Sequence, residues 1–184
     1  MNAIIQNKKD LIFYKKNIVN KIKILAEKTP NKRARLCIHQ SIKNKTNEMI
    51  IALKKGSYIR PHIHPNSKSE SYHVIEGKMN VFIFSKSGKK IKVINMGDYK
   101  SNLNFYYRMN KGYFHLPIAV SKWCVYHEIY SGPFIKNKDV RYAKWAPKEA
   151  NKKIEHGLYI LGKIYNNELF EKEYAITDFE KHVE

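Results

Sequence analysis

Cysteine is scarce in this chain: Cys37 and Cys124 are the only two among 184 residues. They lie far apart and form no Cys-x-x-Cys pair, which excludes a disulfide-rich scaffold and a cysteine-based zinc ribbon. The sequence also lacks an apolar run near the length of about 18 residues that a membrane-spanning helix needs. The short apolar cluster at residues 3–5 is too small for a signal-peptide core. We therefore expect reduced thiols, no membrane span and a cytoplasmic location.

Acidic residues are also few, with 16 against 35 basic residues, which gives a net charge of +19. A basic chain can bind nucleic acid by neutralising phosphates. However, 30 of the basic residues are lysines spread along the chain, and the densest cluster, residues 32–35, is short. No nucleic-acid-reading motif accompanies this charge. The sequence therefore disfavours a nucleic-acid partner and favours small anionic substrates.

Hydrophobic residues make up 43% of the chain, enough for the core of one globular domain. At the N-terminus, apolar residues recur at steps of three and four, which predicts an amphipathic helix over residues 9–28. Thr29 and Pro30 would end this helix. We assign residues 1–35 to an N-terminal helical segment.

Short strands separated by turn residues follow, from Leu36 to about Tyr130. The predicted strands are residues 48–53, 58–64, 72–76, 78–84, 91–95, 104–109, 114–120 and 123–130. About eight such strands with glycine-containing turns are typical of a closed or double-sheet antiparallel fold. The fold class is therefore mainly β, with one β-barrel domain over residues 36–150.

The composition changes after residue 150. Residues 151–184 carry 5 basic and 7 acidic side chains, a net charge of −2, whereas the preceding 150 carry 30 and 9, a net charge of +21. We expect this C-terminal extension to be partly helical and to pack on the barrel or on a partner subunit. Because antiparallel sheets must cover their edge strands, we also expect a homodimer.

Three histidines and one glutamate form the most informative pattern. His62 and His64 are two residues apart, so in a strand they point to the same face. The turn residues 65–67 then reverse the chain, and Glu70 opens a second apolar strand beside the first. His115 opens another apolar stretch much further along the chain.

This set of donors is suited to a divalent transition metal. Such ions favour imidazole nitrogen and carboxylate oxygen, and four side-chain ligands leave positions open for water or substrate. We therefore predict one bound ion, of zinc, iron, manganese or nickel, on His62, His64, Glu70 and His115. His73 is the competing histidine, but its strand parity is opposite to that of Glu70, so it should face outward.

The same parity places further side chains near the predicted metal. Tyr58 and Arg60 should share the face of the histidine pair and contact substrate. Arg60 offers a planar fork for a carboxylate or phosphate, with a salt bridge at the barrel rim as the alternative. Tyr72 is the candidate for proton transfer near the metal, or else a core ring with a satisfied hydroxyl. Lys68 would lie at the barrel mouth, either binding an anion or solvated.

The pattern resembles the cupin superfamily, whose first motif combines glycine, His-x-His, glutamate and a second glycine, and whose second motif ends in Gly-x-x-His. Here the first motif spans residues 56–77 and the second ends at residues 112–115. The chain departs from the usual pattern in two places. Five residues separate His64 from Glu70, and Asn110 replaces the proline usual in the second motif.

Four further segments are similar to the WbuC family of cupin-fold metalloproteins. These segments are residues 37–39, 57–65, 132–134 and 145–149. The resemblance spans roughly residues 9–150 and implies a cupin-type antiparallel β-barrel or jelly roll. It also implies a setting, because the family is associated with bacterial O-antigen and related surface-polysaccharide gene clusters.

Three functions are compatible with this setting. The first is a metal-dependent isomerase or epimerase acting on an anionic sugar or nucleotide sugar, by analogy with sugar-isomerising cupins. The second is an iron-dependent oxygenase, since the same ligands leave room for dioxygen and substrate. The third is a non-catalytic sugar-binding or regulatory protein. Fold alone does not choose among them.

Overall fold

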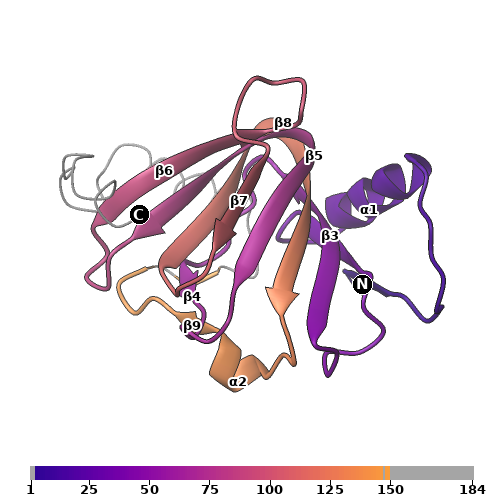
Figure 1. Ribbon diagram of the computed structural model, residues 1–184. Helices are drawn as coiled ribbons and strands as arrows, with labels where there is room; N and C mark the ends of the chain where they lie inside the picture. The colour runs from indigo at the N-terminus through magenta and orange to yellow at the C-terminus, as the bar shows by residue number, and fades with distance from the viewer. Residues whose placement is uncertain (1–2, 147, 150–184) are drawn as a thin grey trace.

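The structure of the protein, a computed structural model, describes residues 3–146 and 148–149. Nine strands and two helices are found in this part of the chain (Figure 1). In chain order they are β1 (Ile4–Gln6), α1 (Asn17–Glu27), β2 (Arg33–Cys37), β3 (Thr46–Lys54), β4 (His62–Ile63), β5 (Glu70–Phe84), β6 (Lys90–Gly97), β7 (Tyr106–Met109), β8 (Phe114–Ser131), α2 (Lys136–Asp139) and β9 (Arg141–Tyr142). The predicted mainly β fold class is confirmed.

One curled sheet contains all nine strands. Its main path runs β1-β2-β3-β8-β4-β9, and β5 pairs with β6, β7 and β8. The two long strands, β5 and β8, run antiparallel to each other from Glu70 opposite Tyr130 to Phe84 opposite Phe114. Register shifts interrupt this pairing between residues 74 and 79 of β5; one end of the pair joins β3 and β7, and the other joins β4 and β6.

The inside of this curled sheet is one apolar core. Fifteen buried residues form it, among them Leu53, Tyr72, Met79, Cys124 and Tyr126. Their side chains come from β2, β3, β5, β6, β7 and β8, so the core ties the two ends of the long strand pair together. Both cysteines belong to this core and neither forms a disulfide, as expected.

Helix α1 packs on the outer face of β2 and β3 (Figure 1). Val19, Ile22 and Ala26 are its buried residues and form a second apolar cluster with side chains of the sheet. The predicted helix over residues 9–28 is too long at its N-terminal end. Leu11 and Phe13 are 79% and 81% exposed, so the residues before α1 have no surface on which an apolar helical face could be buried.

Several predicted strands have different boundaries in the structure. Residues 72–76 and 78–84 are one strand, β5, and residues 114–120 and 123–130 are one strand, β8. Gly77, predicted to be a turn, instead lies within β5 with a φ of +82°. The predicted strand over residues 58–64 is reduced to His62 and Ile63.

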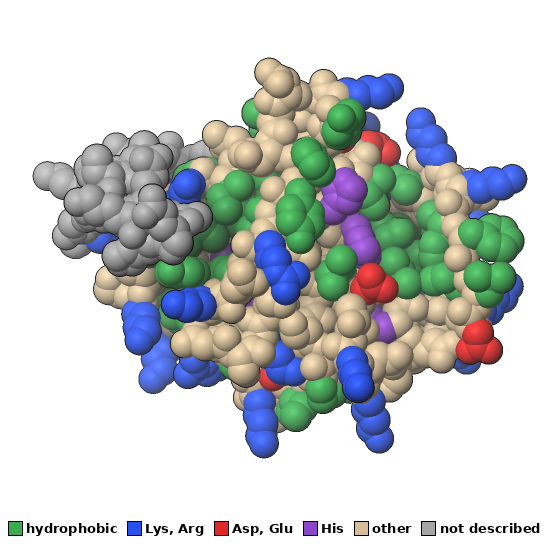
Figure 2. All heavy atoms as spheres, in the orientation of Figure 1, with side chains coloured by type: hydrophobic (Ala, Val, Ile, Leu, Met, Phe, Trp, Pro, Cys, Tyr) green, Lys and Arg blue, Asp and Glu red, His purple; other side chains and the backbone are tan. Residues whose placement is uncertain are grey.

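Strand β2 crosses the predicted boundary between residues 35 and 36, so the N-terminal segment contributes to the sheet. The C-terminal extension, residues 151–184, lies outside the described residues. No helix in the described part of the chain is long and apolar enough to span a membrane. Lysine and arginine side chains project from many places on the visible face rather than from one patch (Figure 2). The homodimer and the cytoplasmic location stay predictions.

The packing of α1 gives a first prediction. Ile22 is fully buried beneath this helix, whereas Ile24 on the same helix is 58% exposed. Replacing Ile22 by alanine should lower the free energy of unfolding by about 2–4 kcal/mol, because it leaves a cavity in a packed interface. Urea denaturation followed by circular dichroism measures this change. The matched control, Ile24→Ala, should cost less than about 1 kcal/mol; equal losses would contradict this packing.

Candidate metal centre

The two segments that carry the histidines are paired backbone to backbone. His62, the first residue of β4, lies directly opposite His115, the second residue of β8. Their ring centroids are 4.3 Å apart, and His64 lies 5.3 Å from His115 by the same measure. Glu70, the first residue of β5, completes the group. The structure thus brings together four side chains that the sequence separates by more than fifty positions.

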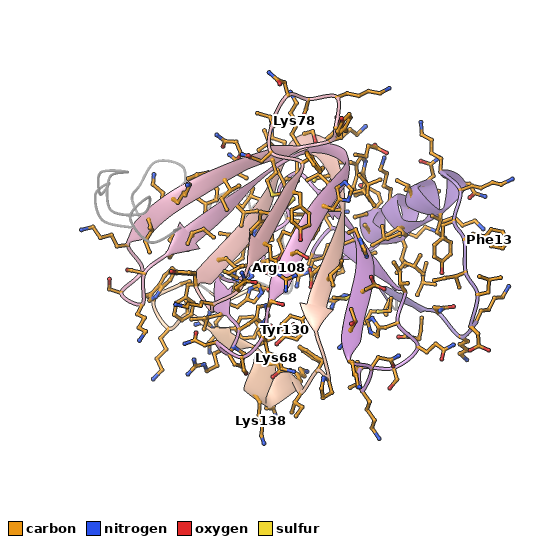
Figure 3. The ribbon with its side chains drawn as sticks, viewed as in Figure 1. Phe13, Lys68, Lys78, Arg108, Tyr130 and Lys138 are labelled. Carbon is orange, nitrogen blue, oxygen red and sulfur yellow. The ribbon has the colours of Figure 1, made fainter. Side chains whose placement is uncertain are left out.

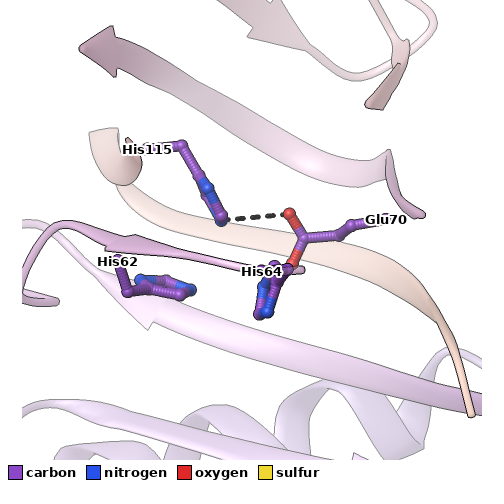
Figure 4. A group of neighbouring side chains, drawn as sticks. All are labelled: His62, His64, Glu70 and His115. Atoms are coloured by element: carbon purple, nitrogen blue, oxygen red, sulfur yellow. Dashed lines mark hydrogen bonds and ion pairs between the residues drawn. The ribbon is translucent and has the colours of Figure 1, made fainter. Parts of the chain in front are cut away.

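The four side chains form a compact, largely buried cluster (Figure 4). One nitrogen or oxygen from each lies within 4.8 Å of those from the others. The carboxylate of Glu70 is central: Oε1 lies 3.2 Å from His64 Nε2, and Oε2 lies 3.1 Å from His115 Nε2. Glu70, His64 and His115 are buried, and His62 is half-buried on the more open side.

The second ring nitrogen of each histidine fixes how the ring is protonated. Nδ1 of His62 donates to the carbonyl of Arg60 at 3.1 Å, and Nδ1 of His64 donates to that of Asp139 at 2.6 Å. Nδ1 of His115 donates to the carbonyl of Tyr113 at 3.0 Å. A carbonyl oxygen only accepts, so each Nδ1 carries the proton. In the neutral ring, each Nε2 therefore presents a lone pair.

The histidine nitrogens that face Glu70 need a proton or a cation beside them. Within the described residues, His115 Nε2 is buried and has no hydrogen-bond donor or acceptor in suitable geometry. Imidazole lone pairs next to an ionised carboxylate repel one another unless a proton or a cation lies between them. Nitrogen and oxygen donors in this number match the ligands that a divalent transition metal takes in proteins. The cluster therefore fits one such ion.

The carboxylate and the imidazoles shift the pKa values of one another. Burial alone would raise the pKa of Glu70, but the nearby rings of His115 and His64 hold it well below its ordinary value. Burial, together with the neighbouring His115 and His64, lowers the pKa of His62 well below its ordinary value. Burial also opposes the charged form of His64, but Glu70 outweighs it and raises the pKa. The carboxylate is thus kept ionised beside the imidazoles.

A glycine lets the two histidine segments approach each other. A Cβ added to Gly112 would lie 2.0 Å from the carbonyl oxygen of His64, closer than atoms can approach. The backbone nitrogen of Gly112 donates to Asn66 Oδ1 at 3.2 Å, which ties the turn after β4 to the segment before β8. This explains in physical terms why glycine precedes His115 by three residues.

Two contacts of the cluster were not predicted from the sequence. The hydroxyl of Tyr107, on β7, donates to Glu70 Oε2 at 3.2 Å. The carbonyl of Asp139, at the end of α2, accepts the Nδ1 proton of His64. Strand alternation could have suggested Tyr107, because it lies opposite Tyr72 in the β5–β7 register. Asp139 acts through its backbone, so its side-chain type gives no signal.

Tyr72 and Tyr58 are both buried, but only Tyr72 belongs to the core inside the curled sheet; Tyr58 precedes β4, so the strand parity that was expected to aim it inward does not extend to it. Tyr72 is 1% exposed and packs edge-on to Tyr107, with ring centroids 4.9 Å apart. Burial, with the charge of Glu70 next, raises the pKa of Tyr72 well above its ordinary value. Tyr58 belongs to a separate apolar cluster with Phe82 and Leu116. Their catalytic and substrate-binding roles stay predictions.

Arg60 and Lys68 are engaged with the backbone. The guanidinium of Arg60 donates to the carbonyl of Ala143 and lies over the ring of Tyr142, 5.9 Å from its centroid. Arg60 precedes β4, so the strand parity that was expected to aim it inward does not extend to it. Lys68 Nζ donates to the carbonyl of Pro133 at 2.9 Å, near the start of the chain segment leading to α2 (Figure 3). Binding of substrate by either residue would have to displace these contacts, and it stays a prediction.

His73 faces outward, as its parity predicts. It is exposed, and its ring lies 5.6 Å from that of Phe105 on the outer surface. Two other histidines are also apart from the cluster. His39 accepts a hydrogen bond from the backbone nitrogen of Glu48 at 3.0 Å, and His127 Nε2 lies 3.8 Å from the carboxylate of the same residue.

Comparisons with known proteins give a partial family match. Residues 14–96 match a family described as a domain of unknown function, DUF6016. This match covers less than half of the chain and ends before His115. No curated protein matches the chain.

Solved structures resemble the chain only distantly. A recombinant oxalate oxidase in complex with glycolate has 14% identity and a TM-score of 0.49 over 76% of this chain and 75% of its own. A mutant oxalate decarboxylase OxdC of Bacillus subtilis has 17% identity and a TM-score of 0.46 over 60% of this chain. The capsular polysaccharide assembling protein CapF of Staphylococcus aureus has 18% identity and a TM-score of 0.44 over 54%. The chain spans only 27% and 26% of the last two.

The fold is identified on the chain's own features. A strand with His-x-His, a glutamate that opens the next strand and a distant histidine meet at one end of a curled, mainly antiparallel sheet. The protein has a cupin-like fold. Its resemblance to the WbuC family and the chemistry of its site stay predictions.

Tyr107 gives a second prediction. Replacing it by phenylalanine keeps the ring but removes the hydroxyl that holds Glu70, so zinc affinity should fall by about tenfold, the effect expected for groups that orient a metal ligand. Competition with a chelating dye measures the affinity. Tyr106→Phe is the matched control, because Tyr106 is the neighbouring residue and is 45% exposed. Equal zinc affinities for the two variants would show that the hydroxyl does not support the ligand.

Proposed function

We propose that the protein is a metal-dependent cupin that isomerises or epimerises an anionic sugar or nucleotide sugar in the synthesis of a bacterial surface polysaccharide. The observation that carries the proposal is the cluster of three Nε2 lone pairs and one carboxylate at the end of the curled sheet. The substrate class and the pathway rest on the resemblance to the WbuC family.

Each residue of the cluster has a defined task in this proposal. His62, His64 and His115 would bind the ion through Nε2, and Glu70 would balance its charge. A bound divalent ion would polarise a carbonyl or hydroxyl oxygen of the substrate, which makes the neighbouring C–H bond more acidic. The backbone carbonyls that accept the Nδ1 protons keep the three rings from rotating. Substrate would approach past the half-buried His62, since the other three ligands are buried.

Metal content gives a third prediction. The purified protein should retain close to one divalent ion per chain, and the double variant His62→Ala, His64→Ala should retain almost none, because half of the ligands are lost. Elemental analysis by mass spectrometry measures the content. His73→Ala should keep its metal, since His73 is exposed on the outer surface. Full occupancy in the double variant would rule out this site.

The reaction itself can be tested by isotope exchange. A panel of nucleotide sugars incubated with the metal-loaded protein in deuterated water should yield one sugar with deuterium at the isomerised or epimerised carbon. Mass spectrometry detects the exchange, and the His62→Ala, His64→Ala variant should show none. Oxygen uptake by the iron-loaded protein without exchange would favour the oxygenase instead. Binding without exchange or oxygen uptake would favour a non-catalytic sugar-binding protein.

A further inference from the structure

Two charged residues lie on the inner face of the curled sheet, next to its apolar core. The β2–β3 register pairs Cys37 with Met49, and the β3–β8 register pairs Met49 with Glu128. Cys37 and Met49 belong to the core, so Glu128 faces inward in the same row. Arg35 lies two residues before Cys37 on β2 and therefore faces the same way.

Water reaches the inner face at these two positions. Arg35 and Glu128 are both partly exposed, whereas Cys37 and Met49 between them are buried. Solvent therefore reaches these two inward-facing charges at the edge of the apolar core. Glu128 lies near the metal centre, because it is paired with Tyr72 in the β5–β8 register and Glu70 is two residues from Tyr72. Such diagonal neighbours have Cα atoms about 7–8 Å apart.

Arg35 has weaker partners than Arg33 and Arg108. Its Nη1 contacts only the thioether sulfur of Met49, at 3.7 Å, and no carboxylate within residues 3–146 and 148–149 lies within ion-pair distance. By contrast, Arg33 pairs with Glu149 at 2.8 Å, and Arg108 donates to Ser69 Oγ at 2.9 Å. A thioether is a weak acceptor, and a guanidinium has five donors. Most of the hydrogen-bonding capacity of Arg35 is therefore available to a ligand.

Glu128 lies between this arginine and the metal centre. Burial, and then the charge of Glu70, raise the pKa of Glu128 to about 8, while Arg35 and His64 act in the opposite direction. The carboxyl group thus interacts electrostatically with Arg35 on β2 and with Glu70 and His64 of the metal centre. A ligand bound on this inner face would contact Arg35 on β2, Glu128 on β8 and then the metal centre.

We propose that Arg35 binds the anionic group of the substrate inside the curled sheet, and that Glu128 forms a hydrogen bond with a hydroxyl group of the same ligand. This proposal rests on the proposed function for the position of the reacting end. Three strand spacings, of about 4.8 Å each, separate β2 from β5. A ligand that contacts both Arg35 and the metal centre therefore carries its carboxylate or phosphate at the end remote from the metal.

The experiment is calorimetric titration of the zinc-loaded protein with glucose 1-phosphate and with glucuronate, with glucose as the neutral reference. Both anions should bind more tightly than glucose, and Arg35→Gln should weaken their binding by about tenfold or more, because a charge-assisted hydrogen bond is lost. Arg35→Lys should recover part of this loss, since it keeps the charge without the planar fork. Glu128→Gln should weaken the binding of both anions and of glucose.

Arg108→Gln is the matched control. It removes the same charge from the exposed face of β7 and should leave all three affinities within about twofold of the wild type. Equal anion affinities for Arg35→Gln and the wild type, or no binding of either anion, would overturn the proposal.

Repeating the titration on chelator-treated protein separates this proposal from the metal-centre proposal. Anion binding that still depends on Arg35 in the chelator-treated protein would support the anion site, whereas failure of the untreated protein to bind zinc would refute only the metal centre. Normal metal content in Arg35→Gln, together with unchanged anion affinity, would refute only the anion site.

Discussion

The site depends on three hydrogen bonds from histidine Nδ1 to backbone carbonyls. Each bond is made with a different part of the chain: the segment before β4, the end of α2 and the segment before β8. Together they direct three Nε2 lone pairs toward the carboxylate of Glu70. A cation bound at this point would remove the repulsion between these acceptors. Metal binding would therefore stabilise the folded chain.

The curled sheet makes this convergence possible. Glu70 and His115 lie at opposite ends of the long β5–β8 pair, and only the curvature of both strands brings their side chains to 3.1 Å. The apolar core inside the sheet maintains that curvature, because the same buried residues contact both ends of the pair. Gly112 then allows the β4 segment to lie against the start of β8 without a steric clash.

Much of the metal centre could be predicted from the sequence, because it depends on local rules. The two-residue spacing of His62 and His64 and the parity of Glu70 against His73 are properties of any extended strand. The direction of Arg60 could not be predicted in this way, since the structure has no strand at that residue. The contacts made by Tyr107 and by the carbonyl of Asp139 depend on how distant segments meet, and no spacing in the sequence encodes them.

The fold, too, could be predicted only in part from the sequence. Apolar alternation predicted the strands, but the continuity of β5 through Gly77 depends on a positive φ within the strand, which glycine adopts readily and which an alternation pattern does not reveal. Helix α1 is shorter than its periodicity suggests, because a helical pattern forms a stable helix only where its apolar face finds a partner. Arg35 drew attention only as part of a short basic cluster; its inward direction follows from the β2–β3 register.

The most direct test of this account is nuclear magnetic resonance of the histidine ring nitrogens before and after one equivalent of zinc is added. The account predicts that zinc shifts the Nε2 signals of His62, His64 and His115, that their Nδ1 atoms keep their protons, and that His73 does not change. Binding through Nδ1, or zinc-induced shifts at other histidines in place of these three, would contradict it.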